Sequence, residues 1–213
     1  MFNRNTWIIL AVAAAFAGLL AGWHFTQGNA APPGPALQAF KRFESTRQIP
    51  PFELVRADGS ALTNASLQGH WTLVFLGFTH CPDVCPTTLA QLKTAQKAWE
   101  SIPADKRPRV LFVSVDPERD TPEIVGKYAQ AFHSDTIAAT GTQAALEQFA
   151  RGLSLVFMKQ PPDDLSQPNR YAVDHSAALA VLDPQGRMAG VIQPPLEPAK
   201  IAADFIALTE AAK

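Results

Sequence analysis

An almost uninterrupted apolar run in the middle of the chain restricts the fold more than any other feature. Residues 70–78 read HWTLVFLGF, and the run is bounded by Gly69 on one side and by a loop with two cysteines on the other. A strand that is apolar at successive positions is buried on both faces, which requires other elements to cover both sides of its sheet. The run therefore predicts a central strand of an α/β domain.

Strand and helix signals alternate along the rest of the chain. Apolar runs mark strands, apolar residues at helical spacing mark helices, and Gly, Pro and Asp mark turns. In chain order these signals predict a hairpin over 52–63, a helix over about 86–102, a buried strand over 109–115, helices from Thr121 to about His133 and after Thr142, a strand over 155–159, a hairpin over 177–193 and a last helix with Ile201, Phe205, Leu208 and Ala212 on one face. The order predicts an α/β sandwich around a mixed central sheet flanked by helices.

The N-terminal stretch predicts one transmembrane helix over residues 1–25. Its segment IILAVAAAFAGLLA carries no charge, and Trp7 and Trp23 flank it as in the aromatic belts of membrane proteins. As a helix, the segment with its flanks would rise about 28 Å, enough to cross a hydrocarbon core. Arg4 precedes the segment and no basic residue follows before Lys41. The charge distribution predicts a single-pass membrane protein with its N-terminus in the cytoplasm and its domain outside. We expect this membrane to be the inner (cytoplasmic) membrane, with the domain on the periplasmic side.

A cleaved signal peptide is the other interpretation of the same stretch. Residues 28–31, GNAA, offer the small residues that such cleavage requires. Both interpretations export the domain. Residues 26–50 are small, polar and rich in proline, which predicts a linker and places the folded domain at 51–213.

The charge composition argues against nucleic acid as a partner. The formal net charge is −1 over 213 residues. The chain has no basic block or stripe that could follow a phosphate backbone.

The only two cysteines lie between the predicted central strand and the helix that follows it. Cys81 and Cys85 fall in FLGFTHCPDVCPTTLAQL, and Pro86 suits the first position of a helix. The helix dipole should favour the thiolate, so we expect Cys85 to be the more acidic thiol. Such a pair can exchange with disulfides, attack a peroxide or bind a metal. A structural disulfide is the remaining interpretation, although closing so short a loop would stabilise the fold little.

The spacing of the cysteines favours a metal. Thioredoxin-type exchange prefers two intervening residues, whereas three let both sulfur atoms face one ion. Two thiolates need a further ligand, and imidazole suits copper. His24 lies at the end of the N-terminal apolar stretch, and His70 is predicted at the surface. His133 is predicted at a helix C-terminus, and His80 on the opposite side of the chain from its neighbour Cys81. His175, at the entrance to an apolar strand, is the remaining candidate, and the residues alone leave its contact with the cysteines open.

Three segments together resemble the signatures of the Sco/SenC family. They are GFTHCPDVCPTTLAQL, VSVDPERDTPE and VDHSAALAVLDPQGR, and the similarity extends over about residues 50–210. Members of that family are membrane-anchored copper proteins with a thioredoxin-like fold and an inserted hairpin, and they assemble the dinuclear copper centre of cytochrome c oxidase. The resemblance implies that Cys81, Cys85 and His175 bind one copper ion per chain, as Cu(I) or Cu(II).

The resemblance also implies a role and partners. The chain would be a copper metallochaperone that delivers its ion to the copper-centre subunit of cytochrome c oxidase, with another copper chaperone as the donor. A redox-active Cys81–Cys85 disulfide would block loading. The alternative is an enzyme, a thiol-disulfide oxidoreductase that reduces the cysteines of that centre before metallation. Thioredoxin-like reductants place a cis-proline opposite their cysteines, where this chain has His175, which favours the metal. Asp116, in the family's DPERD segment, is interpreted as a turn residue.

Overall fold

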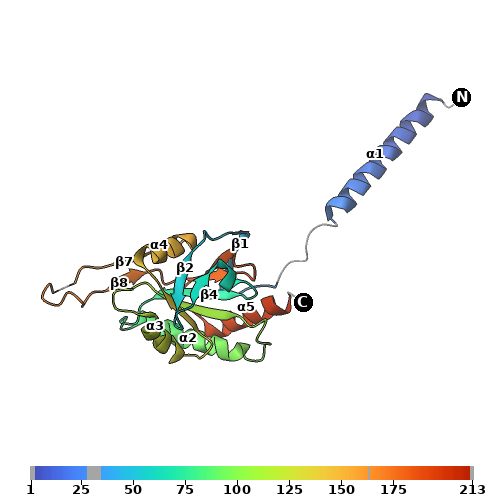
Figure 1. Cartoon of the computed structure of the whole chain (residues 1–213). Coiled ribbons are helices and arrows are strands. Elements are labelled where there is room, and N and C mark those ends of the chain that lie inside the picture. The colour runs from blue at the N-terminus through green and yellow to red at the C-terminus, as the bar shows by residue number, and fades with distance from the viewer. Residues whose placement is uncertain (1–2, 28–34, 163, 212–213) are drawn as a thin grey trace. The chain divides into compact units, whose positions relative to one another are not determined.

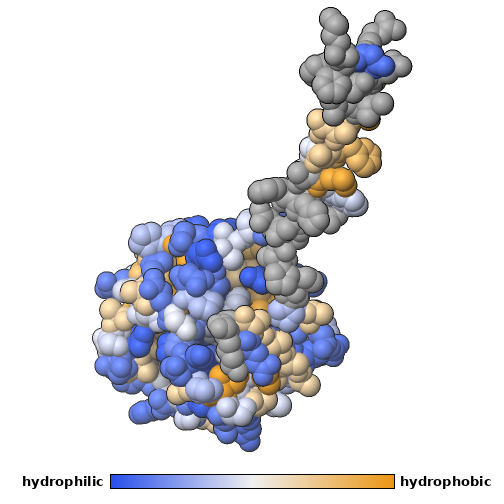
Figure 2. Space-filling model, turned by 90° about the vertical axis from the view of Figure 1, so that its right-hand side faces the viewer, coloured by the Kyte–Doolittle hydropathy of each residue, from blue (hydrophilic) through white to orange (hydrophobic). Residues whose placement is uncertain are grey.

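The computed structural model describes residues 3–27, 35–162 and 164–211. The chain divides into two compact units, Met1–Pro35 and Ala36–Lys213. The first unit contains the 24-residue helix α1 (Arg4–Gln27), whose described large apolar side chains are exposed. Orange and tan atoms mark the apolar residues along the described part of this helix in Figure 2. Within the described residues, no helix is both long and apolar enough to cross a membrane, so the prediction of a transmembrane helix is not supported. The possible cleavage site at 28–31 lies outside the described residues.

The second unit is built on a mixed eight-stranded sheet. Strands β4, β5 and β6 run parallel to one another, and every other pair of neighbours in the sheet is antiparallel. In spatial order the strands are β1 (Phe40–Arg47), β10 (Met188–Ile192), β9 (Leu179–Leu182), β4 (Thr72–Gly77), β5 (Arg109–Ser114), β6 (Ile137–Thr140), β2 (Glu53–Arg56) and β3 (Ala61–Thr63). The predicted α/β sandwich with a mixed central sheet is confirmed.

Helices cover both faces of this sheet. In the view of Figure 1, α2 (Val84–Trp99), α3 (Pro122–Gln130) and α5 (Pro198–Glu210) lie below the sheet, and α4 (Gln143–Gly152) lies above it. A short 3-10 helix, η1 (Asn64–Leu67), follows β3. The crossovers β4-α2-β5 and β5-α3-β6 place their helices on the same face, as expected of two crossovers of the same hand.

The predicted central strand is β4, and it is buried along its whole length. Its Phe75 side chain is fully enclosed and packs against Phe112 of β5. On the face covered by α2 and α5, Trp99 contacts the Phe205 ring, and its indole N–H donates to the carbonyl oxygen of Ala202 at 3.2 Å. The chain leaves this enclosed strand at Gly77 and enters the cysteine loop, so the loop starts from a rigid support.

Strand β1 corrects the predicted boundary of the domain. Phe40 pairs with Ile192 of β10, and the backbone N–H groups of residues 38–40 donate to the buried carboxylate of Asp204 at 2.8–2.9 Å. The folded unit therefore begins near residue 36 and not near residue 51, and the predicted linker ends earlier. Strand β1 escaped prediction because most of its residues are exposed and polar, which also describes a linker.

A separate two-stranded hairpin carries the histidine of interest. Strands β7 (Phe157–Lys159) and β8 (Val173–His175) pair antiparallel, with Phe157 opposite His175. The described residues of their connection, 160–162 and 164–172, reach away from the main sheet in Figure 1. His175 is the last residue of β8, at the end of the hairpin opposite to the 160–172 connection. Strand β7 lies within the predicted strand 155–159, whereas β6 and β8 were not predicted.

Candidate metal site

The two cysteines lie where the chain passes from β4 into α2. Cys81 belongs to the loop between them and is partly exposed, whereas Cys85 lies in the first turn of α2 and is fully buried. The backbone N–H of Cys85 donates to the Cys81 sulfur at 3.5 Å. Both thiols are free. The loop therefore holds one sulfur inside the domain and one beside solvent.

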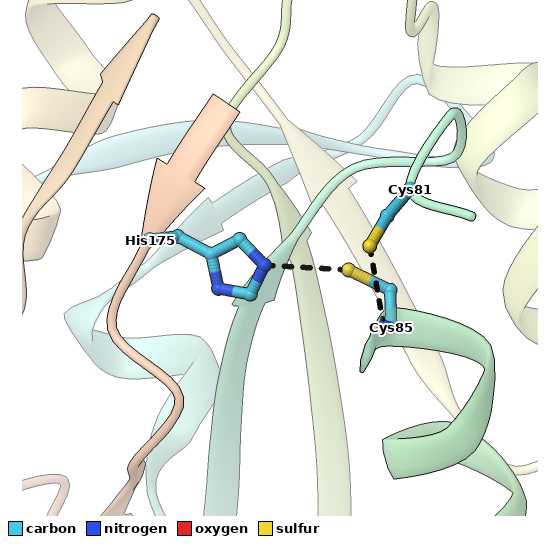
Figure 3. Close-up of side chains that lie close together, drawn as sticks. All are labelled: Cys81, Cys85 and His175. Atoms are coloured by element: carbon cyan, nitrogen blue, oxygen red, sulfur yellow. Dashed lines mark hydrogen bonds between the residues drawn. The ribbon is translucent and has the colours of Figure 1, made fainter. Parts of the chain in front are cut away.

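The structure brings His175 to these cysteines across 90 residues of sequence. Its Nε2 lies 3.4 Å from the Cys85 sulfur (Figure 3). Its Nδ1 donates to the carbonyl oxygen of Ser176 at 3.2 Å, and this tautomer leaves the Nε2 lone pair free for a ligand. The edges of Phe75 and Phe78 pack against the imidazole ring, with centroids 5.7 and 6.1 Å away. Burial lowers the pKa of His175, which keeps the ring neutral near pH 7.

These three side chains fit a single soft metal ion. One donor atom of each lies within 4.8 Å of the other two. Bonds of about 2.0–2.3 Å, as found for zinc with nitrogen and sulfur, allow ligand atoms at such separations to share one ion. Two thiolates and an imidazole are donors that suit copper, with thiolates selecting Cu(I) in particular. The sequence-based ligand set is thus assembled in space, although the contact with His175 is not predictable from local patterns.

The expected acidity of Cys85 is not supported. Burial raises the pKa of the Cys85 thiol far above its usual range, and the neighbouring Cys81 raises it further. The helix dipole is outweighed because the sulfur lies in the protein interior, where an anion loses its hydration. Cys85 is therefore a thiol in the metal-free protein at neutral pH, and it must lose a proton to bind a metal.

Among the described side chains, His70, His80 and His133 are not grouped with the two cysteine sulfurs. His70 is buried, so the prediction that it lies at the surface is wrong. Its Nδ1 donates to the carbonyl oxygen of Arg107 at 2.8 Å, which satisfies the ring in the interior. His133 lies 3.6 Å from a carboxylate oxygen of Glu100. His80 is exposed and groups with two buried aspartates of the DPERD segment, not with the cysteines. The prediction that His80 lies apart from the pair is consistent with this grouping.

Gly77, at the end of β4, is a contributor that the sequence analysis missed. A Cβ atom at this position would lie 2.9 Å from the Cys85 sulfur and 2.8 Å from the ring of Phe112. Both distances are shorter than van der Waals contact, so only glycine leaves room for the buried sulfur. A glycine at the end of an otherwise apolar strand is the signal that could have indicated such a close approach.

A cavity of about 600 Å³ opens beside the cysteine loop. It is lined by Phe78, His80 and Pro82 of the loop, by Arg119, and by residues of the β7–β8 connection. His80 and Pro82 are the two chain neighbours of Cys81. A partner bound in this cavity would thus lie next to the more exposed thiol.

Comparisons with known proteins agree with this fold and with copper as the ion. The model of the SCO1/SenC family matches residues 41–210. The mitochondrial SCO1 homolog 1 of Arabidopsis thaliana is 40% identical over 63% of this chain, which spans only 39% of that relative's length. A putative copper-binding protein of Stutzerimonas stutzeri is 33% identical over 71% of this chain and 72% of its own. The structure of Bradyrhizobium japonicum ScoI with copper bound is 34% identical, with a TM-score of 0.66 over 74% of this chain and 97% of that one.

Proposed function

The chain belongs to the SCO1/SenC family, and from this premise we propose that it is a copper metallochaperone. Its reduced Ala36–Lys213 unit would bind one copper ion through Cys81, Cys85 and His175 and pass it to the subunit of cytochrome c oxidase that holds the dinuclear copper centre. The observation that carries the proposal is the approach of His175 Nε2 to the Cys85 sulfur at 3.4 Å, from a separate hairpin.

The three ligands have different tasks in this proposal. His175 offers a neutral nitrogen that is already oriented by the Ser176 carbonyl group. Cys85 holds the ion from inside the domain and releases its proton when the ion binds, so loading weakens at low pH. Cys81 lies on the exposed side, where an incoming thiolate of a partner can replace it. Three ligands leave the coordination open, which suits a site that must release its ion.

The proposed source of the copper follows from the ligands, and the proposed location follows from the N-terminal sequence. A soft Cu(I) site is filled most directly by another thiolate protein, so the proposed donor is a second copper chaperone. The proposed location is the extracytoplasmic side of the inner membrane, in agreement with the export that the N-terminal sequence predicts. In that compartment a Cys81–Cys85 disulfide can form, and it would prevent loading until it is reduced.

A transfer assay tests the proposal. The reduced protein is loaded with one equivalent of Cu(I) and mixed with the reduced, copper-free soluble domain of the copper-centre subunit from the same organism. After separation, copper is measured on each protein. We expect copper to move to the subunit domain. Copper that stays on the donor under all conditions, or a reduced protein that does not bind copper, would contradict the proposal.

The two free thiols also favour a second candidate, a thiol-disulfide oxidoreductase. Cys81 is accessible and Cys85 lies against it, which is the arrangement of an attacking and a resolving thiol. In this reaction the dithiol would become a disulfide, and one disulfide of the subunit domain would become two thiols. The same proteins test it without copper, with the subunit domain oxidised beforehand. Thiol transfer without any copper binding would replace the chaperone role by this one.

A further inference from the structure

The segment DPERD, residues 116–120, contains buried charged side chains that are not among the proposed copper ligands. Asp116 and Asp120 are 3% and 1% exposed, and the side chain of Arg119 is 11% exposed. Burying three charged groups is costly unless each has partners of opposite charge or hydrogen bonds. The segment follows β5, directly beside β4 and the cysteine loop, so its partners bear on the site.

Asp120 holds the cysteine loop. Its carboxylate accepts the backbone N–H of Thr79 at 2.9 Å and the Thr79 hydroxyl at 2.5 Å. The hydroxyl of Ser114, the last residue of β5, donates to the same carboxylate at 2.5 Å. Thr79 lies two residues before Cys81. The start of the cysteine loop is thus attached to the end of β5 through one buried carboxylate.

Arg119 and Asp116 hold the hairpin that carries His175. The Arg119 Nη1 donates to the carbonyl oxygens of Asn169 and Tyr171, both at 3.1 Å, and its guanidinium lies 3.6 Å from the centre of the Tyr171 ring. Its Nε donates to Asp116 at 2.5 Å, and the Tyr171 hydroxyl donates to the other oxygen of Asp116 at 2.6 Å. Tyr171 lies four residues before His175, on the same arm of the hairpin.

One short turn therefore connects both sides of the site. The backbone N–H groups of Arg119 and Asp120 both donate to the carbonyl oxygen of Asp116, which fixes the turn itself. We infer that the 116–120 turn sets the separation between the two sulfurs and His175, and that Asp116, Arg119 and Asp120 are positioning residues for copper. The copper part of this inference rests on the proposed function. Residues that orient metal ligands typically contribute 10- to 100-fold in metal affinity.

The contacts of Asp120 and the contacts of Asp116 are expected to affect copper binding differently. Loss of a contact on the Asp120 side loosens the loop with Cys81, and the thiolates bind both oxidation states of copper. Loss of a contact on the Asp116 side loosens His175, and an imidazole nitrogen matters more to Cu(II) than to Cu(I). A role in folding alone would not separate the two sets of contacts in this way.

Two substitutions that keep the shape of the side chain each remove one of these two sets of contacts. Thr79→Val removes the hydroxyl that donates to Asp120, and Tyr171→Phe removes the hydroxyl that donates to Asp116. Thr79→Ser keeps the first hydroxyl and should restore the wild-type behaviour. Thr136→Val is the matched control, because it removes a buried hydroxyl whose partner is Gln96, a residue outside the copper ligands and the 116–120 turn.

Copper binding is measured by competition for Cu(I) and by the electron paramagnetic resonance and charge-transfer spectra of the Cu(II) protein. We expect Thr79→Val to weaken both Cu(I) and Cu(II) by about 10- to 100-fold. Tyr171→Phe should weaken Cu(II) and reduce its nitrogen coupling, while Cu(I) affinity is largely kept. Wild-type affinities and spectra in both variants, with the same loss of stability as Thr136→Val, would overturn the inference.

Amide hydrogen exchange of the metal-free protein provides a second readout that needs no copper. We expect faster exchange over residues 79–81 in Thr79→Val and over residues 169–175 in Tyr171→Phe, each without a change in the other segment. Uniform exchange changes in both segments, or none in either, would overturn the inference even if copper binds. If the wild type binds no copper, the proposed function fails, and exchange alone decides the role of the 116–120 turn.

Discussion

Gly77→Ala tests whether the end of β4 makes room for the buried sulfur. The added Cβ would lie 2.8 Å from the Phe112 ring and 2.9 Å from the Cys85 sulfur, and both neighbours are fully buried. Neither can move into solvent, so the substitution overpacks the core. Overpacking of this kind costs about 1–3 kcal/mol of unfolding free energy. For a domain of this size each kcal/mol lowers the melting temperature by about 2–4 °C.

The same substitution should damage the metal site beyond its effect on stability. Displacing the Cys85 sulfur changes its distance to His175, so we expect weaker copper binding and an altered Cu(II) charge-transfer band. Urea unfolding and copper competition measure the two effects on one sample. Gly141→Ala is the matched control, because its Cβ would meet a core leucine, Leu54, at 2.9 Å, with no copper ligand among its close contacts.

A double substitution separates the two contacts of the added methyl group. Phe112→Leu in the Gly77→Ala background removes the clash with the ring but not the clash with sulfur. Part of the stability should return while copper binding stays impaired. A Gly77→Ala protein with wild-type stability, or one that is destabilised yet binds copper with the wild-type spectrum, would refute the reasoning.

Three further outcomes follow from burial and hydrogen bonding. Alkylation of the reduced, metal-free protein at neutral pH should label Cys81 well before Cys85, because Cys85 is buried and its pKa is raised; equal rates by mass spectrometry would contradict this. Burial lowers the pKa of His70, so the unfolded state binds its proton first, and stability should fall as the pH drops below about 6.5. His70→Gln should lose less stability than the wild type between pH 7 and pH 5. If the urea unfolding midpoints of the two proteins fall equally over this range, His70 is not the group responsible. Asp204→Ala leaves three backbone N–H groups at the start of β1 without their carboxylate, so it should cost more than about 3 kcal/mol and increase exchange over residues 38–40, whereas an unchanged midpoint would show that β1 is held by other contacts.

Elements with a strong local pattern could be predicted from the sequence. Strand β4 was recognisable because its residues are apolar almost without interruption, and α3 because Thr121, Pro122 and Glu123 form a helix start; the Thr121 hydroxyl indeed accepts the backbone N–H of Ile124. The turn at Asp58-Gly59 was equally clear, since Gly59 adopts a positive φ of 80° that glycine permits.

Features that depend on distant partners could not be predicted in this way. Strand β1 is mostly exposed, and only its pairing with β10 and its contacts with Asp204 reveal it as part of the sheet. The acidity of Cys85 was misjudged because its helix position is visible in the sequence but its burial is not. His175 lies 90 residues from Cys85, so its role came from the family resemblance and not from spacing.

Copper content of the reduced protein after desalting tests the central claim most directly. The wild type should retain about one copper ion per chain, and Cys81→Ala and Cys85→Ala should retain almost none. His175→Ala should keep part of its Cu(I) but lose the Cu(II) charge-transfer band, because two thiolates alone can hold Cu(I). His80→Ala, the control from the neighbouring exposed histidine, should match the wild type. A wild-type Cu(II) spectrum in His175→Ala, together with its loss in His80→Ala, would contradict the ligand set.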